Sequence, residues 1–244
     1  MYGQSFVKKL IKKNGDNSEV VLDTLAIVLD KTITYYPSSM KDGKMNVSNS
    51  INFENITSER IFINTMLYVI NKAEYGREHI EKLDVENKQL SVILEIPSNF
   101  YSENSTYYQY NNTFRAIGTK LSFTASEMLV KYKNLMGDWK EIPFEDLNPD
   151  KKAKHKNYAN EHAALNSIYL NDLFLFIKTN QPEKVIHWNN IAEGNIVKGM
   201  NETECLLAIG KPMHIRKNGN QIKWMVNNDF VVIFENNIVI RVIR

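Results

Sequence analysis

Few residues of this sequence have the types and spacing that catalysis or metal binding requires. The five histidines are His79, His155, His162, His187 and His214. None lies four residues from another, the spacing that aligns two metal ligands on one helix face, and no H-E-x-x-H motif occurs. The pair at 155 and 162 would be separated by about 10 Å along a helix, which is too far for one metal ion. The pattern favours surface histidines over a metal centre.

Cysteine and serine chemistry is equally restricted. The single cysteine, Cys205, has no basic neighbour in sequence that would lower its thiol pKa. A lone thiol forms no intramolecular disulfide and cannot build a zinc site without several partners. No G-x-S-x-G motif, calcium loop or phosphate loop occurs. We therefore predict that the chain is not an enzyme and has no cofactor or metal. An enzyme of unrecognised class is the alternative.

Two clusters are candidates for a binding surface. KKAKHK, residues 151–156, is a basic run that could contact phosphate or anionic lipid head groups. YYQY, residues 107–110, could form an aromatic surface together with Trp139. The alternatives are a solvated helix start and a strand that begins with exposed tyrosines. The candidate binding residues are Tyr107, Tyr108, Tyr110, Trp139, Lys151, Lys152, Lys154 and Lys156.

Composition excludes several classes of protein. The chain has 244 residues, of which 43% are hydrophobic and 24% charged, as is typical of globular proteins. Thirty basic residues balance 28 acidic ones, so no general electrostatic footprint for nucleic acid is present. No apolar run is long enough to span a bilayer. Residues 1–15 show no signal peptide, although the sequence is also compatible with a mature form whose signal was removed.

These clusters must be positioned by a larger α+β framework. Residues 1–50 include a short amphipathic helix, FVKKLIKKN, which we expect to pack on the first domain; binding to a membrane surface is the alternative. Residues 51–180 begin with a strand, SINFENI, and a helix capped by Thr57 or Ser58. Four strands follow, three of them with alternating apolar and polar residues: REHIEKLDV, QLSVILEI, AIGTKLSFTA and EMLVKYKN. This pattern predicts an antiparallel sheet covered on one side.

A long helix should close the first domain. It is predicted to begin at Asn148 and Pro149, with an apolar second half that covers the sheet. The sheet would then have two covering helices. Residues 181–194 contain a proline, a glycine and no clear period, so they are predicted to be a linker.

Residues 195–244 are predicted to form a small module of a helix followed by a three-stranded meander. The helix has Asn201 as N-cap, Glu204 completing a capping box, Gly210 at the end and Pro212 preventing continuation. The strands are QIKWMV, FVVIFE and IVIRVI, and Trp224 is expected in their core.

This last segment resembles the SmpA/OmlA family of small outer-membrane lipoproteins (BamE-like). The likeness lies in VKGMNETECLLAIGKPMHI, KWMV and VVIFENNIVIRV. Asn201 stands where Thr or Ser is usual, and Asn236–Asn237 replace a glycine-containing turn. The resemblance implies an extracytoplasmic protein that binds other proteins or lipid and has no catalytic residues. Because Cys205 lies inside the helix, it cannot be the lipid-anchor cysteine of that family.

Residues 51–180 resemble an uncharacterised domain of bacterial envelope proteins with a TATA-binding-protein-like (TBP-like) fold. The likeness lies in FENI, IEKLDVENKQLSVILEI, GTKLSFTASEMLVKYKN and WKEIPFEDLNPDKKAKHK. This fold serves many purposes and does not imply DNA binding.

Together these features predict a non-catalytic cell-envelope protein with a binding or structural role. The expected partner is another envelope protein or a lipid, and no nucleic acid is expected. The expected location is the periplasm or the inner face of the outer membrane, with the cytoplasm as the alternative. A second alternative function is weak binding of nucleic acid or an anionic surface through the basic helix start.

Overall fold

The structure of the chain is a computed structural model. It describes residues 39–41, 44–72, 80–98, 106–134, 136–147, 153–227 and 229–244, without the side chains of 39–45 and 153–164. The predicted N-terminal helix and the predicted helix start at Asn148 and Pro149 lie outside the described residues. So do Lys151 and Lys152 of the basic run.

The chain divides into two compact units, each built from segments that are distant in sequence. One unit contains Met1–Asn49, Ile93–Asn112 and Phe123–Leu175, and the other contains Ser50–Val92, Thr113–Ser122 and Phe176–Arg244. The C-terminal segment therefore shares a unit with the predicted helix that follows Thr57. The predicted division into domains at 51–180 and 195–244 stays a prediction.

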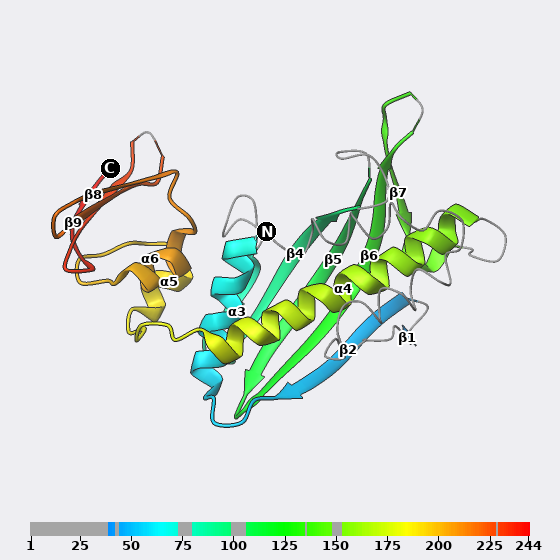
Figure 1. Ribbon diagram of the computed structural model, residues 1–244, viewed down its shortest axis with the longest axis horizontal. Coiled ribbons are helices and arrows are strands. Elements are labelled where there is room, and N and C mark those ends of the chain that lie inside the picture. Colours follow the sequence, from blue (N-terminus) through cyan, green and yellow to red (C-terminus); the bar gives the residue numbers. More distant parts are fainter. Residues whose placement is uncertain are drawn as a thin grey trace. The chain divides into compact units, whose positions relative to one another are not determined.

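Within the described residues, the wide sheet has seven strands in the order β1-β2-β6-β5-β4-β3, with β7 paired to β6 (Figure 1). The strands are β1 Ser39–Lys41, β2 Lys44–Asn52, β3 Ile80–Asp84, β4 Gln89–Pro97, β5 Thr106–Ile117, β6 Lys120–Lys133 and β7 Trp139–Pro143. Their buried and less buried residues alternate, as in β5, where Tyr108, Tyr110 and Phe114 are completely buried. One face of the sheet is thus core and the other is accessible.

The sequence pattern misplaced one turn of this sheet. AIGTKLSFTA was predicted to be a single strand, but β5 ends at Ile117 and β6 begins at Lys120. Gly118 has a φ of +58°, which glycine adopts without steric cost, so the chain reverses there. Even-numbered residues are buried up to Ala116 and odd-numbered ones from Leu121, so the phase of the alternation shifts at the turn. Ile117 is apolar but 54% exposed, and it conceals this shift in the sequence because it continues the odd-numbered series of Leu121 and Phe123.

Two long helices accompany the sheet. Helix α3 spans Ser58–Lys72 and is capped by the Thr57 hydroxyl, which accepts a hydrogen bond from the Arg60 N–H at 3.3 Å. Helix α4 spans Ala153–Thr179. Its Phe174 ring lies 6.0 Å from the ring of Phe123 in β6, so the apolar second half of α4 packs on the buried face. A short 3-10 helix, η2, covers Phe144–Asp146. No helix in the described part of the chain is both long and apolar enough to cross a bilayer.

Side chains of α3 satisfy the carbonyl groups at the C-terminal end of α4. Asn64, which is fully buried, donates to Ile177 O at 3.3 Å and Asn180 O at 3.1 Å, and accepts from Asn180 Nδ2 at 2.8 Å. The Arg60 guanidinium donates to Asn180 O and Lys178 O. These carbonyls have no partner within their own helix, and a cation also suits the negative end of the helix dipole.

We expect Asn64→Ala to lower the free energy of unfolding by about 1–3 kcal/mol, because the Ile177 carbonyl loses its Asn64 donor and the Asn180 side-chain amide loses its acceptor. Chemical denaturation followed by circular dichroism measures this change. The matched control is Asn71→Ala on the same helix, whose exposed side chain should contribute less than about 0.5 kcal/mol. Equal effects of the two substitutions would contradict the role assigned to Asn64.

The C-terminal segment contains two short helices and a second sheet. Helix α5 is Trp188–Glu193 and α6 is Glu202–Ile209. Four strands follow in the order β11-β10-β9-β8, namely β8 His214–Asn218, β9 Gln221–Met225, β10 Val231–Glu235 and β11 Ile238–Ile243. The prediction of a three-stranded meander therefore missed one strand. Strand β8 was not recognised because all its residues are exposed, so its sequence shows no alternation of apolar and polar residues. Similarly, α5 lies inside the segment predicted to be a linker.

The buried side chains of this segment come from both α6 and the second sheet. Cys205 and Leu207 of α6 are fully buried, as are Val232 and Phe234 of β10. Trp224 is 2% exposed, and its ring lies 4.8 Å from that of Phe234.

Helix α6 ends at Gly210, which has a φ of 80° and a ψ of −159°. This combination of angles is essentially restricted to glycine.

Candidate functional site

An aromatic and cationic cluster lies where β5, β6 and β7 meet on the accessible face of the wide sheet. Trp139 is 48% exposed, and its ring lies 5.6 Å from that of Tyr107. Lys133 is directly opposite Trp139 in the β6–β7 register, and its Nζ lies 5.1 Å from the centre of the Trp139 ring. We call Tyr107, Lys133 and Trp139 the aromatic cluster. Its members are held by strands, so its geometry is fixed before any partner arrives.

The tyrosines that were predicted to form one surface lie on opposite faces of β5. Tyr107 is half-buried and belongs to the aromatic cluster, whereas Tyr108 and Tyr110 are completely buried. Tyr108 and Tyr110 therefore belong to the core and not to an exposed surface, because residues an even number apart share a face and odd neighbours do not. Lys154 and Lys156 lie on α4, but their side chains are outside the described part.

A charged group extends the aromatic cluster along β6. Lys131 forms ion pairs with Glu95 at 2.9 Å and with Glu141 at 3.6 Å. Partial burial would lower the pKa of Lys131, but the hydrogen bonds and charges of Glu95 and Glu141 outweigh this and raise it. Lys131 therefore stays protonated and its charge is largely used within the chain, which leaves Lys133 and the exposed ring of Trp139 to face a partner.

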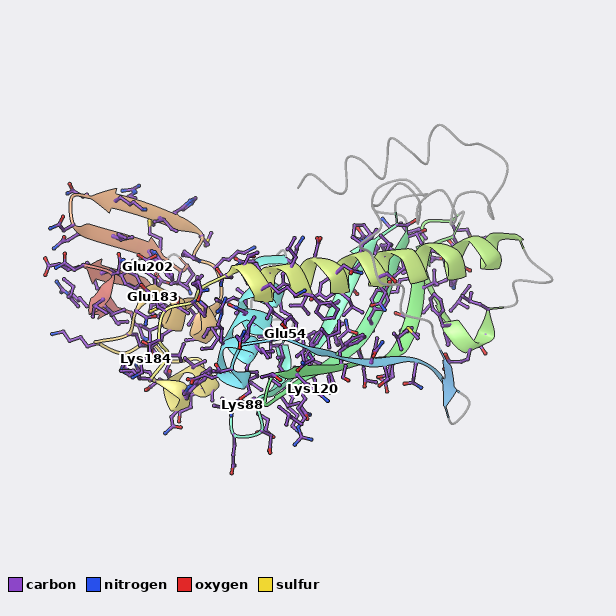
Figure 2. The ribbon with its side chains drawn as sticks, turned by 60° about the horizontal axis from the view of Figure 1, so that its bottom comes forward. Glu54, Lys88, Lys120, Glu183, Lys184 and Glu202 are labelled. Carbon is purple, nitrogen blue, oxygen red and sulfur yellow. The ribbon has the colours of Figure 1, made fainter. Side chains whose placement is uncertain are left out.

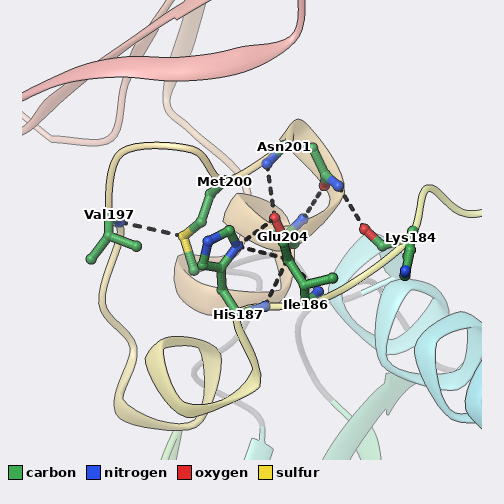
Figure 3. Close-up of polar contacts among 7 residues, drawn as sticks. All are labelled: Lys184, Ile186, His187, Val197, Met200, Asn201 and Glu204. Carbon is green, nitrogen blue, oxygen red and sulfur yellow. Dashed lines mark hydrogen bonds and ion pairs between the residues drawn. The ribbon is translucent and has the colours of Figure 1, made fainter.

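A second polar cluster surrounds Glu204 at the start of α6 (Figure 3). The Glu204 carboxylate is 1% exposed and accepts hydrogen bonds from the N–H groups of Ile186 at 2.7 Å, His187 at 2.9 Å and Asn201 at 2.9 Å. The Asn201 side chain accepts from Glu204 N and donates to Lys184 O. The capping box thus joins α6 to the segment that precedes α5.

The pKa of Glu204 is lowered by this arrangement. Burial alone would raise it, but the hydrogen bonds from Ile186, Asn201 and His187 stabilise the ionised form more strongly. His187 Nδ1 lies 3.0 Å from both carboxylate oxygens. An ionised carboxylate can only accept hydrogen bonds, so Nδ1 carries a proton.

A carboxylate that orients a histidine is also found in hydrolase active sites, so this cluster could in principle support catalysis. The nearest thiol in sequence, Cys205, is buried, and burial together with the Glu204 and Glu202 charges raises its pKa. It is therefore no thiolate nucleophile. In the described part of the chain, no group of three or more His, Cys, Asp and Glu side chains could hold a metal ion. The contacts of the cluster are those of a structural junction.

The neighbouring acid, Glu202, has the opposite electrostatic environment. Burial raises its pKa, and the Glu183 carboxylate raises it further, while Lys217 opposes the shift. Glu183 and Glu202 are labelled in Figure 2. Glu202 therefore has no set of donors like that of Glu204, although it is only two residues away.

Sequence reasoning missed His187 and Lys133. All histidines were predicted to be surface residues, but His187 is only 23% exposed and bound to Glu204. The capping box identified Glu204 as a residue with structural hydrogen bonds, but His187, which contacts it, lies 17 residues upstream and was not linked to it. His214 is exposed as predicted, and the other three histidines have no described side chain.

Comparisons with known proteins identify the fold alone. No protein-family profile matches the sequence, and no curated protein matches it. A TBP-like protein from Parabacteroides distasonis has a similar structure, with 16% identity and a TM-score of 0.51 over 59% of this chain and 98% of that one. A DUF4468 family protein from Bacteroides ovatus is 12% identical, with a TM-score of 0.48 over 62% and 96% of the respective chains. The resemblance to the SmpA/OmlA family rests on sequence alone. The chain thus has an α+β structure, and about 59% of it is similar to a TBP-like fold.

Proposed function

We propose that this chain is a non-catalytic binding protein of the bacterial cell envelope, in the periplasm or at the inner face of the outer membrane. Its ligand is another envelope protein, which docks on the aromatic cluster. The single observation that carries this proposal is the exposure of Trp139 beside Tyr107 and Lys133 on a rigid sheet face. The envelope location is supported by the sequence resemblances of both halves of the chain.

The chemistry of the aromatic cluster suits a protein contact. Tryptophan and tyrosine offer large apolar surfaces with few rotatable bonds and dominate the energetics of protein interfaces. Lys133 occupies only part of the space over the Trp139 ring, because 48% of the residue remains accessible. A partner side chain that covers the ring would exclude water from it, and the strands hold the ring in place at little further entropic cost.

Photocrosslinking tests this proposal. A photoreactive amino acid in place of Trp139 should yield one discrete protein adduct in bacterial envelope extract. The control is the same amino acid in place of Ile117, which is 54% exposed but lies outside the aromatic cluster. Tyr107→Ala in the Trp139-substituted chain should reduce the yield at least severalfold, because the neighbouring ring is lost.

Three results would overturn the proposal. Equal adducts from positions 139 and 117 would indicate unspecific contact. An adduct with lipid instead of protein at position 139 would make lipid the ligand. Conversion of a small molecule by the purified chain, abolished by His187→Asn, would assign catalysis to the Glu204–His187 pair.

A further inference from the structure

The outer face of the second sheet carries a row of positive charges. The strand registers pair Arg216 with Lys223, Lys223 with Ile233, and Ile233 with Arg241. Residues directly opposite each other point to the same face of a sheet. The adjacent Trp224 and Val232 are buried in the core, so the row containing the three cations faces outward. We call Arg216, Lys223 and Arg241 the cation row.

Within the described residues, no acid forms an ion pair with the cation row. All three side chains are exposed, and none has an ion pair or hydrogen bond with another residue in the part of the chain that the structure describes. Arg216 and Lys223 are directly opposite each other, and like charges in this position destabilise a sheet. Glu235 lies in the next row of this face and accepts a hydrogen bond from Gln221 at 3.4 Å.

An apolar row lies on the other side of the cations. The registers place Met225 opposite Val231, and Val231 opposite Ile243, which is 39% exposed. Met225 and Val231 are half-buried, so each offers part of its apolar side chain to a partner. An apolar row beside cations fits a second protein surface that carries both aliphatic side chains and carboxylates.

The composition of the face points the same way. Two of the three cations are arginines, whose planar guanidinium binds carboxylates through two parallel hydrogen bonds. Arginine and methionine are enriched in protein interfaces and lysine is depleted. Adjacent strands are about 4.8 Å apart, so the cations are spaced by roughly 5 and 10 Å across the sheet. Arg216 and Arg241 are therefore three strands, about 14 Å, apart, which is two repeats of an extended chain, where side chains on one face recur about every 7 Å.

We propose that the outer face of β8–β11 is a docking surface for an acidic, extended protein segment that carries both carboxylates and aliphatic side chains. Carboxylates of the segment pair with the cation row, and its aliphatic side chains cover Met225, Val231 and Ile243. This surface shares no residue with the aromatic cluster, so the inference does not depend on the function proposed above.

Fluorescence anisotropy with the full chain tests this surface. The probe is a short fluorescein-labelled peptide of alternating Glu and Val, and its counterpart has Gln in place of Glu. The Glu peptide should bind and weaken with added salt, because the pairs are exposed. The triple variant Arg216→Gln, Lys223→Gln, Arg241→Gln should raise Kd at least tenfold. Its melting temperature should not fall, because a like-charge contact is removed.

The matched control removes the same charge elsewhere. Lys82→Gln, Arg115→Gln, Lys120→Gln also lowers the net charge by three at positions on the wide sheet, of which Lys120 is labelled in Figure 2. Its Kd should stay within twofold of the unmodified chain. The single variant Lys223→Gln repeats the test with minimal perturbation, should the triple variant lose its circular dichroism signal.

Four outcomes would overturn the proposal. Absence of binding to the Glu peptide would remove its basis. Equal loss in both triple variants would reduce the effect to net charge. Equal binding of the Gln peptide would show that carboxylates are not recognised. Binding to phosphatidylglycerol vesicles, lost with the cation row, in place of binding to the Glu peptide would assign the face to a membrane surface.

Discussion

Glu204→Ala should lower the free energy of unfolding by about 3–5 kcal/mol, the range expected when one partner of a buried ionic cluster is removed. Three backbone N–H groups and the His187 ring would lose their acceptor in a site where the carboxylate is 1% exposed. Unpaired buried donors are costly because water cannot replace the missing partner. The N-terminal end of α6 would also lose half of its capping box.

Glu202 provides a control for this substitution within the same helix turn. Its pKa is raised by burial and by Glu183, so its charge is not stabilised by the fold. Glu202→Gln should therefore leave stability unchanged or increase it slightly. Urea denaturation of both variants, followed by circular dichroism, measures the difference. Similar losses in the two variants would refute the specific role of the Glu204 hydrogen bonds.

The same carboxylate predicts how stability depends on pH. Because the pKa of Glu204 is lower in the folded chain than in the unfolded chain, folding favours the ionised form. Its contribution is fully present above the unfolded pKa, about 4.3, and is lost as the pH falls through the folded value. Glu204→Gln should flatten the dependence of the melting temperature on pH in acid. An unchanged pH profile would contradict this assignment.

Much of the fold could be predicted because its elements carry strong local signals. The alternation in β4 and β6 follows from burial on one side, and it was recognised. The wide apolar face of α3 was also recognised, although residues 61–70 are in fact all buried. Helix α6 was located from its two ends. The Asn201 side chain caps the first turn, and the conformation of Gly210 ends the last turn. These features are local, so a single sequence is sufficient to find them.

The missed elements are those whose formation depends on distant partners. Strand β8 has no buried residue and exists because it pairs with β9. The turn at Gly118 shifts the phase of burial between its two strands, but the exposed Ile117 is apolar, so the sequence shows no break in the pattern.

The candidate sites show the same limit. Tyr107 and Trp139 were selected from residue type, but their contact and the position of Lys133 follow from the pairing of β7 with β6. The cation row arises in the same way, since Arg216, Lys223 and Arg241 come together only through strand register. Registers of this kind cannot be derived from composition or local spacing.

Trp224→Ala is expected to have an effect as large as that of Glu204→Ala, but for a different physical reason. Trp224 is 2% exposed in β9 and stacks at a tilt against Phe234, and it lies opposite Val232 of β10. Truncation of a buried tryptophan removes its transfer free energy and leaves a cavity, which together cost about 3–5 kcal/mol. A small sheet has few other buried side chains to offset that loss.

Two further tryptophan substitutions make this prediction specific. Trp139→Ala removes a side chain that is 48% exposed, so it should cost about 1 kcal/mol or less. Trp224→Phe should cost less than Trp224→Ala, because the ring is largely retained. The substitution also removes an indole N–H that is buried without a hydrogen-bond partner in the described chain, and loss of such a donor is favourable. Guanidinium denaturation of the three variants should therefore show that Trp224→Ala is the least stable. If Trp139→Ala lowered the free energy of unfolding as much as Trp224→Ala, Trp224 would not be a core residue of the second sheet.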